Sequence, residues 1–109
     1  MKRLAALTVL LVALAGCKGA TPIKEVLDDP SKFTSEPVRI AGTVTDAVSV
    51  LGVGAYKVKD DTGTITVVSK TTGVPREGAK VGVEGKVQTG YTIGTQSLTV
   101  LVESKRETQ

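Results

Sequence analysis

Two segments, Val38–Thr45 (VRIAGTVT) and Val81–Gln88 (VGVEGKVQ), decide the expected fold. In each segment aliphatic residues alternate with polar or small ones, as in a β-strand with one buried face. Each also carries a glycine, Gly42 or Gly85, which the alternation places on the inward face. A glycine inside a strand marks a bend or bulge, and sharply bent strands close small barrels. The pair therefore favours a closed barrel over an open sheet, and the match is too short to favour a tandem repeat.

Three more strands are predicted from the remaining alternating runs. Tyr56–Asp60 and Thr64–Lys70, joined by the sequence DTG (61–63), form a hairpin in which Gly63 can adopt a positive φ. The fifth strand is the run SLTVLVE (97–103). The stretches 48–55, 71–80 and 89–96 are rich in turn residues and are expected to be turns or loops. The end, SKRETQ (104–109), is expected to fray.

A short helix is expected over residues 22–29, before the first strand. Thr21 can cap its start and a proline follows in the first turn, while Pro30 ends it. Phe33, the single phenylalanine, is expected to pack on the apolar face of this helix. That face carries Ile23, Val26 and Leu27.

The N-terminus has the three parts of a secretory signal peptide. Lys2 and Arg3 precede an almost wholly apolar run, Leu4–Leu14, and small residues follow it. A transmembrane helix needs roughly 20 apolar residues, so this run is too short to span a bilayer. The pattern predicts a cleaved signal peptide over residues 1–16.

The four residues Leu14-Ala15-Gly16-Cys17 resemble the lipoprotein box of bacterial lipoproteins at every position. The resemblance implies that Cys17, the only cysteine, carries a diacylglycerol thioether and becomes the first residue of the mature chain. Several acyl chains hold a protein on a membrane far more firmly than one. The alternative is a secreted protein whose cysteine stands there by chance.

Cleavage changes the electrostatic picture and leaves a short tether. Of fourteen basic and eleven acidic residues, two basic ones are in the signal, so the mature charge falls from +3 to +1. With a mature charge of only +1, the chain has no strong electrostatic reason to bind nucleic acid.

The predicted organisation is a signal peptide (1–16), a lipidated tether (17–21), one domain (22–104) and a flexible tail (105–109). Four residues, 18–21, reach at most about 14 Å, so the domain is expected to lie close to the headgroups.

The strand motifs V-x-I-x-G-x-V, Y-x-V-x-D-x-T-G-x-I-x-V and E-G-x-x-V-x-V-x-G-x-V, over roughly Val38–Val102, resemble the OB-fold. They are similar to bacterial envelope OB domains and to the anticodon-binding type. The resemblance implies an all-β protein, a small five-stranded Greek-key barrel with a short N-terminal helix. The segment 71–79 is too short for the helix that many OB proteins carry there, so the N-terminal helix is expected to cap the barrel. OB relatives bind oligonucleotides, oligosaccharides or proteins through strands two and three and the adjoining loops.

The residue inventory argues against catalysis. The chain has no histidine and its one thiol is assigned to lipid, which removes Cys/His metal sites, histidine bases and cysteine nucleophiles. The acidic pairs Asp28-Asp29 and Asp60-Asp61 stand where turns and helix ends favour aspartate. We expect no enzyme activity, no metal site and no cofactor.

The candidate binding residues lie on the outer face of the second and third strands and in the loop before the fifth. Three lysines on one face can meet phosphate, carboxylate or anionic lipid, although such a face is more often simply solvated. One exposed ring in that loop is a poor platform for stacking bases. Tyr56 has inward parity and is expected in the core. The ligand-binding candidates are Lys57, Lys59, Thr66, Lys70 and Tyr91.

Two functions of different classes remain. The favoured one is a non-catalytic, lipid-anchored OB-fold module of the bacterial cell envelope, extracytoplasmic, that binds an envelope protein or polyanionic ligand. The alternative is a binder of single-stranded nucleic acid or another polyanion through the face of strands two and three; nucleic acid is possible but not favoured.

Overall fold

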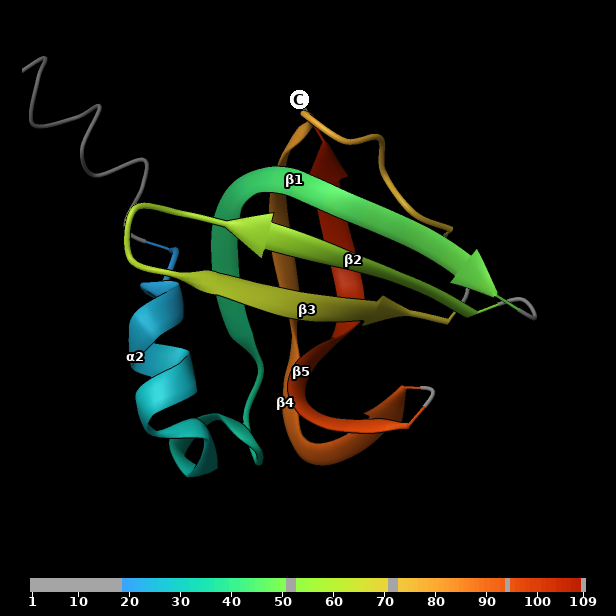
Figure 1. Ribbon diagram of the computed structural model, residues 1–109. Coiled ribbons are helices and arrows are strands. Elements are labelled where there is room, and N and C mark those ends of the chain that lie inside the picture. The colour runs from blue at the N-terminus through green and yellow to red at the C-terminus, as the bar shows by residue number, and fades with distance from the viewer. Residues whose placement is uncertain (1–18, 51–52, 71–72, 94, 109) are drawn as a thin grey trace, which may run out of the picture.

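The computed structural model describes residues 19–50, 53–70, 73–93 and 95–108 (Figure 1). A helix, α2 (Ile23–Asp28), and a 3-10 turn, η1 (Pro30–Phe33), precede five strands. The strands close into a barrel, as the sequence predicted, and their order in it is β1-β2-β3-β5-β4. Every pairing is antiparallel except that of β3 with β5. The strands are β1 (Val38–Val50), β2 (Val53–Lys59), β3 (Thr64–Ser69), β4 (Lys80–Ile93) and β5 (Gln96–Thr108).

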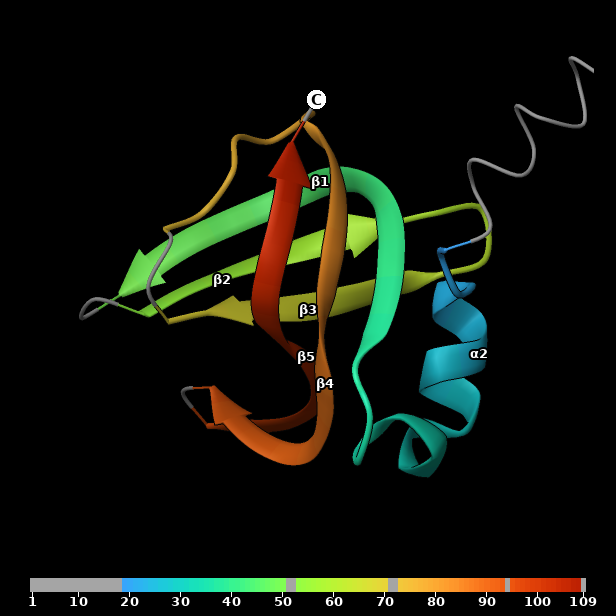
Figure 2. The same cartoon turned by 180° about the vertical axis from the view of Figure 1, so that it is seen from behind.

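Closure of the barrel depends on β1, which pairs with two other strands. Its first half pairs with β4, from Val38 opposite Gly85 to Thr43 opposite Lys80. Its second half pairs with β2, and the ladder is irregular between Val44 and Asp46. A bulge increases local twist and lets a strand bend. One strand therefore passes from one side of the barrel to the other, which Figures 1 and 2 show as a strong curve in β1.

The two inward-facing glycines, Gly42 and Gly85, lie where the backbone of a neighbouring strand comes very close. A Cβ at Gly42 would lie 2.3 Å from the carbonyl oxygen of Lys59, and one at Gly85 would lie 2.1 Å from that of Val102. The β4–β5 ladder is also irregular between Glu84 and Gly85. The prediction of a closed barrel is confirmed, and at both glycines a neighbouring backbone fills the space that a side chain would need. The predicted bend coincides with the glycine at Gly85, whereas the irregularity in β1 lies beyond Gly42, between Val44 and Asp46.

The core is built almost entirely from β-branched residues, with a helix over one end. Ile23 and Val26 of α2 are fully buried and belong to the same cluster as the strand side chains, and Phe33 packs against it. The helix therefore caps the barrel, as expected. The strand members of the cluster are Val38, Ile40, Val44, Tyr56, Val58, Ile65, Val67, Val81, Val83, Val87 and Leu101.

Asp60, in the β2–β3 turn, holds the start of α2. Its carboxylate accepts the backbone N–H of Ile23 at 3.0 Å, and the Thr62 hydroxyl oxygen accepts that of Lys24 at 3.0 Å. The predicted cap, Thr21, makes no such bond; its backbone N–H instead donates to the Arg39 carbonyl at 2.7 Å. The orphan donors of a helix start need acceptors, and here a residue distant in sequence supplies one.

The same carboxylate builds the turn. Asp60 also accepts hydrogen bonds from the N–H groups of Thr62 and Gly63 and from the Thr62 hydroxyl. Partial burial opposes ionisation, but these hydrogen bonds outweigh it and hold the pKa of Asp60 below its ordinary value. Gly63 is not among the positive-φ glycines, so that detail of the predicted hairpin is wrong: the Asp60 side chain shapes the turn.

The C-terminal segment is a strand. Residues 105–108, which the sequence assigned to a flexible tail, pair with β4, ending with Thr108 opposite Val81. The predicted turn 48–55 and loop 89–96 are also largely strand, because β1 with β2 and β4 with β5 continue as hairpins beyond the barrel wall. Charged residues hid the strand at the C-terminus, and glycines hid the two hairpins at 48–55 and 89–96, because the stability of these strand ends comes from pairing rather than burial.

A charged network lies beside the core. The Tyr56 hydroxyl donates to Glu103, the Arg106 guanidinium donates to the same carboxylate at 3.2 Å, and its carbon lies 5.5 Å from the centre of the Tyr56 ring. The Glu103 and Arg106 side chains are only 3% and 15% exposed. Burial, aided by the bond to Glu103, raises the pKa of Tyr56 well above its ordinary value, so the phenol stays a neutral donor. Sequence analysis missed this network because both charged residues fall at or beyond its predicted strand end.

The glycine contacts give a first prediction. Gly42→Ala and Gly85→Ala should each lower the free energy of unfolding by about 1–3 kcal/mol, because even one methyl group meets a backbone oxygen. Denaturant titration of each variant measures this. Gly63→Ala is the matched control, since its Cβ would meet neighbours only at 3.6 Å or more. Wild-type midpoints for both barrel variants would contradict the closure argument.

The Asp60 contacts give a second prediction. A folded pKa below the unfolded value means that the carboxylate contributes its stability above the unfolded pKa of about 3.9 and loses it as the pH falls through the folded pKa. Asp60→Asn should therefore lower stability at neutral pH and reduce its fall in acid, as followed by thermal melts between neutral and acidic pH. Asp61→Asn, a neighbour that makes none of the α2 contacts described above, is the control. Parallel pH profiles for Asp60→Asn and wild type would show that Asp60 does not hold the helix.

Candidate functional site

The outer face of β2 and β3 forms the floor of a groove under the β4–β5 hairpin. We use "the groove" for this cavity of about 150 Å³. Lys57 and Thr66 are register partners on its floor, and Asp46 is opposite Lys57 on β1. The other lining residues are mostly apolar and come from the β1–β2 and β4–β5 hairpins. The full set is Asp46, Ala47, Val48, Ala55, Tyr56, Lys57, Thr66, Ile93, Gln96 and Leu98.

A bend in β4 and β5 creates this groove. The ladder between them is irregular between Gln88 and Tyr91, and Gly90 has a φ of +68°, which favours glycine. Beyond the bend the hairpin turns across the barrel, so that Ile93 and Leu98 reach the same cavity as Val48. Figure 1 shows the curl of this hairpin below β3.

Part of the outer face is covered rather than open. Val68 and Val100 share the face of Thr66, since Thr66 is opposite Val100 and Val68 is two residues along β3. Both are nonetheless buried. In contrast, Val48 at the open side of the groove is 53% exposed. The outer face is therefore covered at Val68 and Val100, which do not line the groove, and the groove has an exposed apolar residue at Val48.

The predicted ligand residues do not form one site. Lys57 and Thr66 lie in the groove, Lys59 lines a different cavity, and Lys70 is exposed just beyond the end of β3. Tyr91 is half-buried in β4 opposite Leu98, rather than exposed in a loop, and does not line the groove. The lipidation candidate, Cys17, lies outside the described residues.

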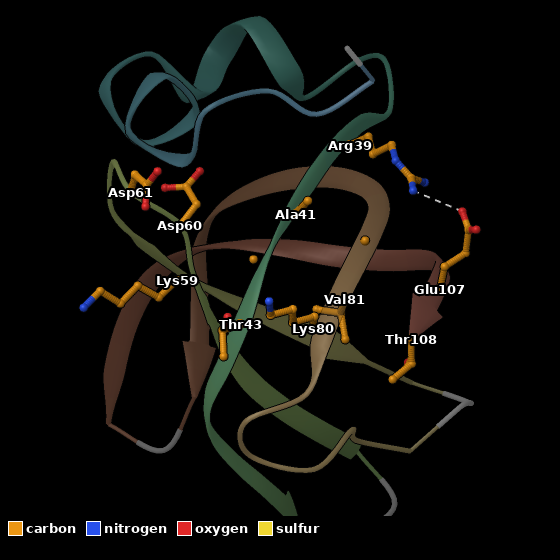
Figure 3. A pocket seen from close by; sticks show the side chains of 12 residues that line it. Arg39, Ala41, Thr43, Lys59, Asp60, Asp61, Lys80, Val81, Glu107 and Thr108 are labelled. Atoms are coloured by element: carbon orange, nitrogen blue, oxygen red, sulfur yellow. Dashed lines mark hydrogen bonds and ion pairs between the residues drawn. The ribbon is translucent and has the colours of Figure 1, made fainter. Parts of the chain in front are cut away.

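The second cavity, which we call "the hollow", has a volume of about 850 Å³ and lies over the first half of β1. Figure 3 shows Lys80 across its middle near Thr43, the paired Arg39 and Glu107 at one rim, and Asp60 with Asp61 at another. The pair joins Arg39 Nη2 to Glu107 Oε1 at 3.1 Å. Sequence analysis missed the hollow because its residues come from four distant segments: residues 39–43, 59–61, 80–82 and 107–108.

Neither a metal site nor a membrane-spanning helix is found among the described residues. Across 19–108, apart from the undescribed gaps, no three His, Cys, Asp or Glu residues are grouped as a metal site requires. In the part of the chain that the structure describes, no helix is long and apolar enough to cross a membrane.

The sequence matches no protein-family model and no curated protein. Solved structures do match. An asparaginyl-tRNA synthetase from Pyrococcus horikoshii is 20% identical with a TM-score of 0.59, over 71% of this chain and 20% of that one. A putative aspartyl-tRNA synthetase from Leishmania major is 16% identical with a TM-score of 0.65, over 82% and 20%. The chain thus spans about a fifth of the length of these synthetases.

Smaller proteins match over more of their own length. The S. pombe Stn1-Ten1 complex is 16% identical with a TM-score of 0.56, over 76% of this chain and 74% of that one. An OBody bound to hen egg-white lysozyme is 18% identical with a TM-score of 0.53, over 68% and 93%. These neighbours are OB-fold proteins. Together with the closed five-stranded order, the comparisons show that this chain has the OB fold.

Proposed function

We propose that this chain is an extracytoplasmic bacterial lipoprotein, anchored through Cys17, whose OB barrel binds another envelope protein in the groove. The observation that carries the proposal is the composition of the groove: apolar side chains from two hairpins surround one lysine, Lys57, which faces Asp46 across the ladder. An apolar centre with few charges suits a protein partner. The OBody bound to lysozyme and the Stn1-Ten1 complex are OB proteins in protein complexes, which supports the same choice.

Polyanion binding is the weaker candidate because the cations are dispersed. Of the three lysines that strand alternation places on one face, only Lys57 lies in the groove, and Tyr91 is absent from its lining. Binding of single strands relies on a basic track with aromatic side chains on which bases stack. The described groove offers one cation beside a carboxylate and no exposed ring. Catalysis is not part of the proposal, since the chain has no histidine and its one thiol is assigned to lipid.

The anchor is tested in the full-length precursor. Cys17→Ala should abolish lipid addition and signal cleavage when expressed in a bacterial host, because the thioether and the processing both depend on the thiol. Fractionation and intact-mass measurement follow the two effects. Cys17→Ser preserves size and polarity and should fail in the same way. Unchanged processing and membrane association in both variants would remove the anchor.

The groove is tested by site-specific photo-crosslinking in cells. A crosslinker at Val48 or Ile93 should give a discrete adduct with one protein, whereas one at Leu27, an exposed apolar position on α2, should not. Leu98→Asp should reduce the Val48 adduct about tenfold by placing a charge in the apolar lining. An equal adduct from Leu27, or one indifferent to Leu98→Asp, would contradict a groove interface.

The same protein titrated with labelled single-stranded oligonucleotides separates the two candidates. We expect weak binding that disappears at physiological salt, because few phosphates can be neutralised. Submicromolar binding at physiological salt, lost in Lys57→Gln but kept in the control Lys86→Gln, would make nucleic acid the leading ligand.

A further inference from the structure

Apolar side chains that face solvent gather beside the groove. Within the described residues, the large apolar side chains that are exposed are Leu27 on α2 and two valines, Val48 and Val53, which are 53% and 41% exposed. Val48 is opposite Ala55 in the β1–β2 ladder, and Val53 lies two residues from Ala55 along β2. Because successive side chains alternate between the two faces of a strand, both valines share the outer face that carries the groove.

We use "the apolar strip" for Val48, Ala55 and Val53 on this face. Val53 does not line the groove, so the apolar surface continues past the cavity along β2. Single exposed apolar residues are normal on a protein surface, whereas apolar residues gathered on one face beside an apolar cavity indicate a contact surface. The surface available to a partner is therefore larger than the groove.

The volume of the groove limits what enters it. A cavity of about 150 Å³ holds one benzene ring, and the volume of the groove is about 150 Å³. Pockets for drug-sized ligands and cofactors take roughly 300 Å³ or more. The aliphatic lining comes from Val48 of the β1–β2 hairpin and from Ile93 and Leu98 of the β4–β5 hairpin. The groove therefore fits one leucine- or phenylalanine-sized side chain rather than a whole small molecule.

Net charge does not select the ligand of the groove. Its two charged residues, Asp46 and Lys57, are opposite in sign and are partners in the β1–β2 ladder. Since their charges sum to zero, the groove attracts neither a polyanion nor a polycation over a distance. Binding there depends on apolar contact and on the shape of the cavity.

The size of the apolar surface argues for a short segment rather than a folded partner or a second copy of this chain. A standard interface between folded proteins buries about 800 Å² on each partner, and obligate dimers bury more. One side-chain-sized groove and two exposed valines supply only part of such an area. A short segment needs less surface, because a few anchor residues carry most of the binding energy of an interface.

We infer that the groove and the apolar strip form a docking site for a short linear segment of the partner protein. The segment inserts one leucine- or phenylalanine-sized side chain into the groove and lays smaller apolar residues along Val48 and Val53. This inference rests on the proposed function, in which the groove binds another envelope protein, and names the chemistry of that partner. An interface below the standard size suits a weak, transient complex, so we expect a micromolar Kd.

The probe that tests this site is a phage-displayed library of random dodecapeptides. The full-length protein is held by a C-terminal tag in phosphatidylcholine nanodiscs, and empty nanodiscs first remove phage that bind lipid. Selected peptides should share one leucine, isoleucine, methionine or phenylalanine. Replacing that residue with alanine in a synthetic copy of the peptide should lower the affinity about tenfold.

Ala55→Leu tests whether a side chain enters the groove. The substitution adds apolar surface but fills the cavity, so the affinity for the selected peptide should fall about tenfold. Val53→Ser, at an exposed position outside the groove, should lower the affinity about threefold and keeps the test valid where Ala55→Leu alters folding. Leu27→Ser removes an exposed apolar side chain from α2 and is the control, which should leave the affinity unchanged.

The outcomes distinguish this inference from the proposed function. An affinity that Ala55→Leu leaves unchanged or raises, or that does not depend on the large apolar residue of the peptide, would show that no side chain enters the groove. An affinity that Val53→Ser leaves unchanged would show that the apolar strip is not part of the site.

The crosslinker at Val48 in cells reports the proposed function separately. If Val48 gives its adduct but no peptide is enriched over empty nanodiscs, the partner docks a folded surface, and the linear segment is wrong while the proposed function stands. If peptides bind as expected but Val48 gives no adduct in cells, the docking site stands and the envelope partner of the proposed function is wrong.

Discussion

The close approach of backbone to backbone at Gly42 and Gly85 is the constraint on which the barrel depends. At both points a carbonyl oxygen of a neighbouring strand occupies the space that a Cβ would need. β1 can then pair with β4 along its first half and with β2 along its second half. β4 can also bend within its ladder to β5. A side chain at either glycine would meet a backbone oxygen and weaken the closed barrel.

Closure also explains how a chain with so few aromatic residues makes a core. The interior is narrow enough to be filled by valine and isoleucine, with one tyrosine as its largest side chain and α2 over one end. Beside that tyrosine the barrel encloses a carboxylate and a guanidinium, which is costly unless each charge is paired. Glu103 and Arg106 satisfy each other, and Ser69 adds a longer contact of 3.5 Å to the carboxylate.

The two cavities arise in different parts of the barrel, the groove beyond its closed wall and the hollow over the wall itself. The β1–β2 and β4–β5 hairpins extend beyond the closed wall, and the bend near Gly90 brings the second across the outer face of the first, which creates the groove. At the other end, the start of β4 and the end of β5 lie beside β1 and form the hollow. The fold thus separates the mostly apolar groove from the charged hollow, and the short segment before α2 lies on the side of the hollow.

The sequence by itself determined the five strands' core, the inward glycines and the apolar side of the helix, because alternation and glycine placement reflect burial directly. It could not determine where strands end when pairing continues without burial, as in residues 89–93 and 104–108. Nor could it place Lys57 and Lys59 in different cavities, since two outward residues on one strand share parity whatever curvature separates their surroundings. Only the tertiary structure joined Asp60 to Ile23, Arg39 to Glu107 and Tyr56 to Glu103, because long-range contacts depend on how the closed sheet brings distant segments together.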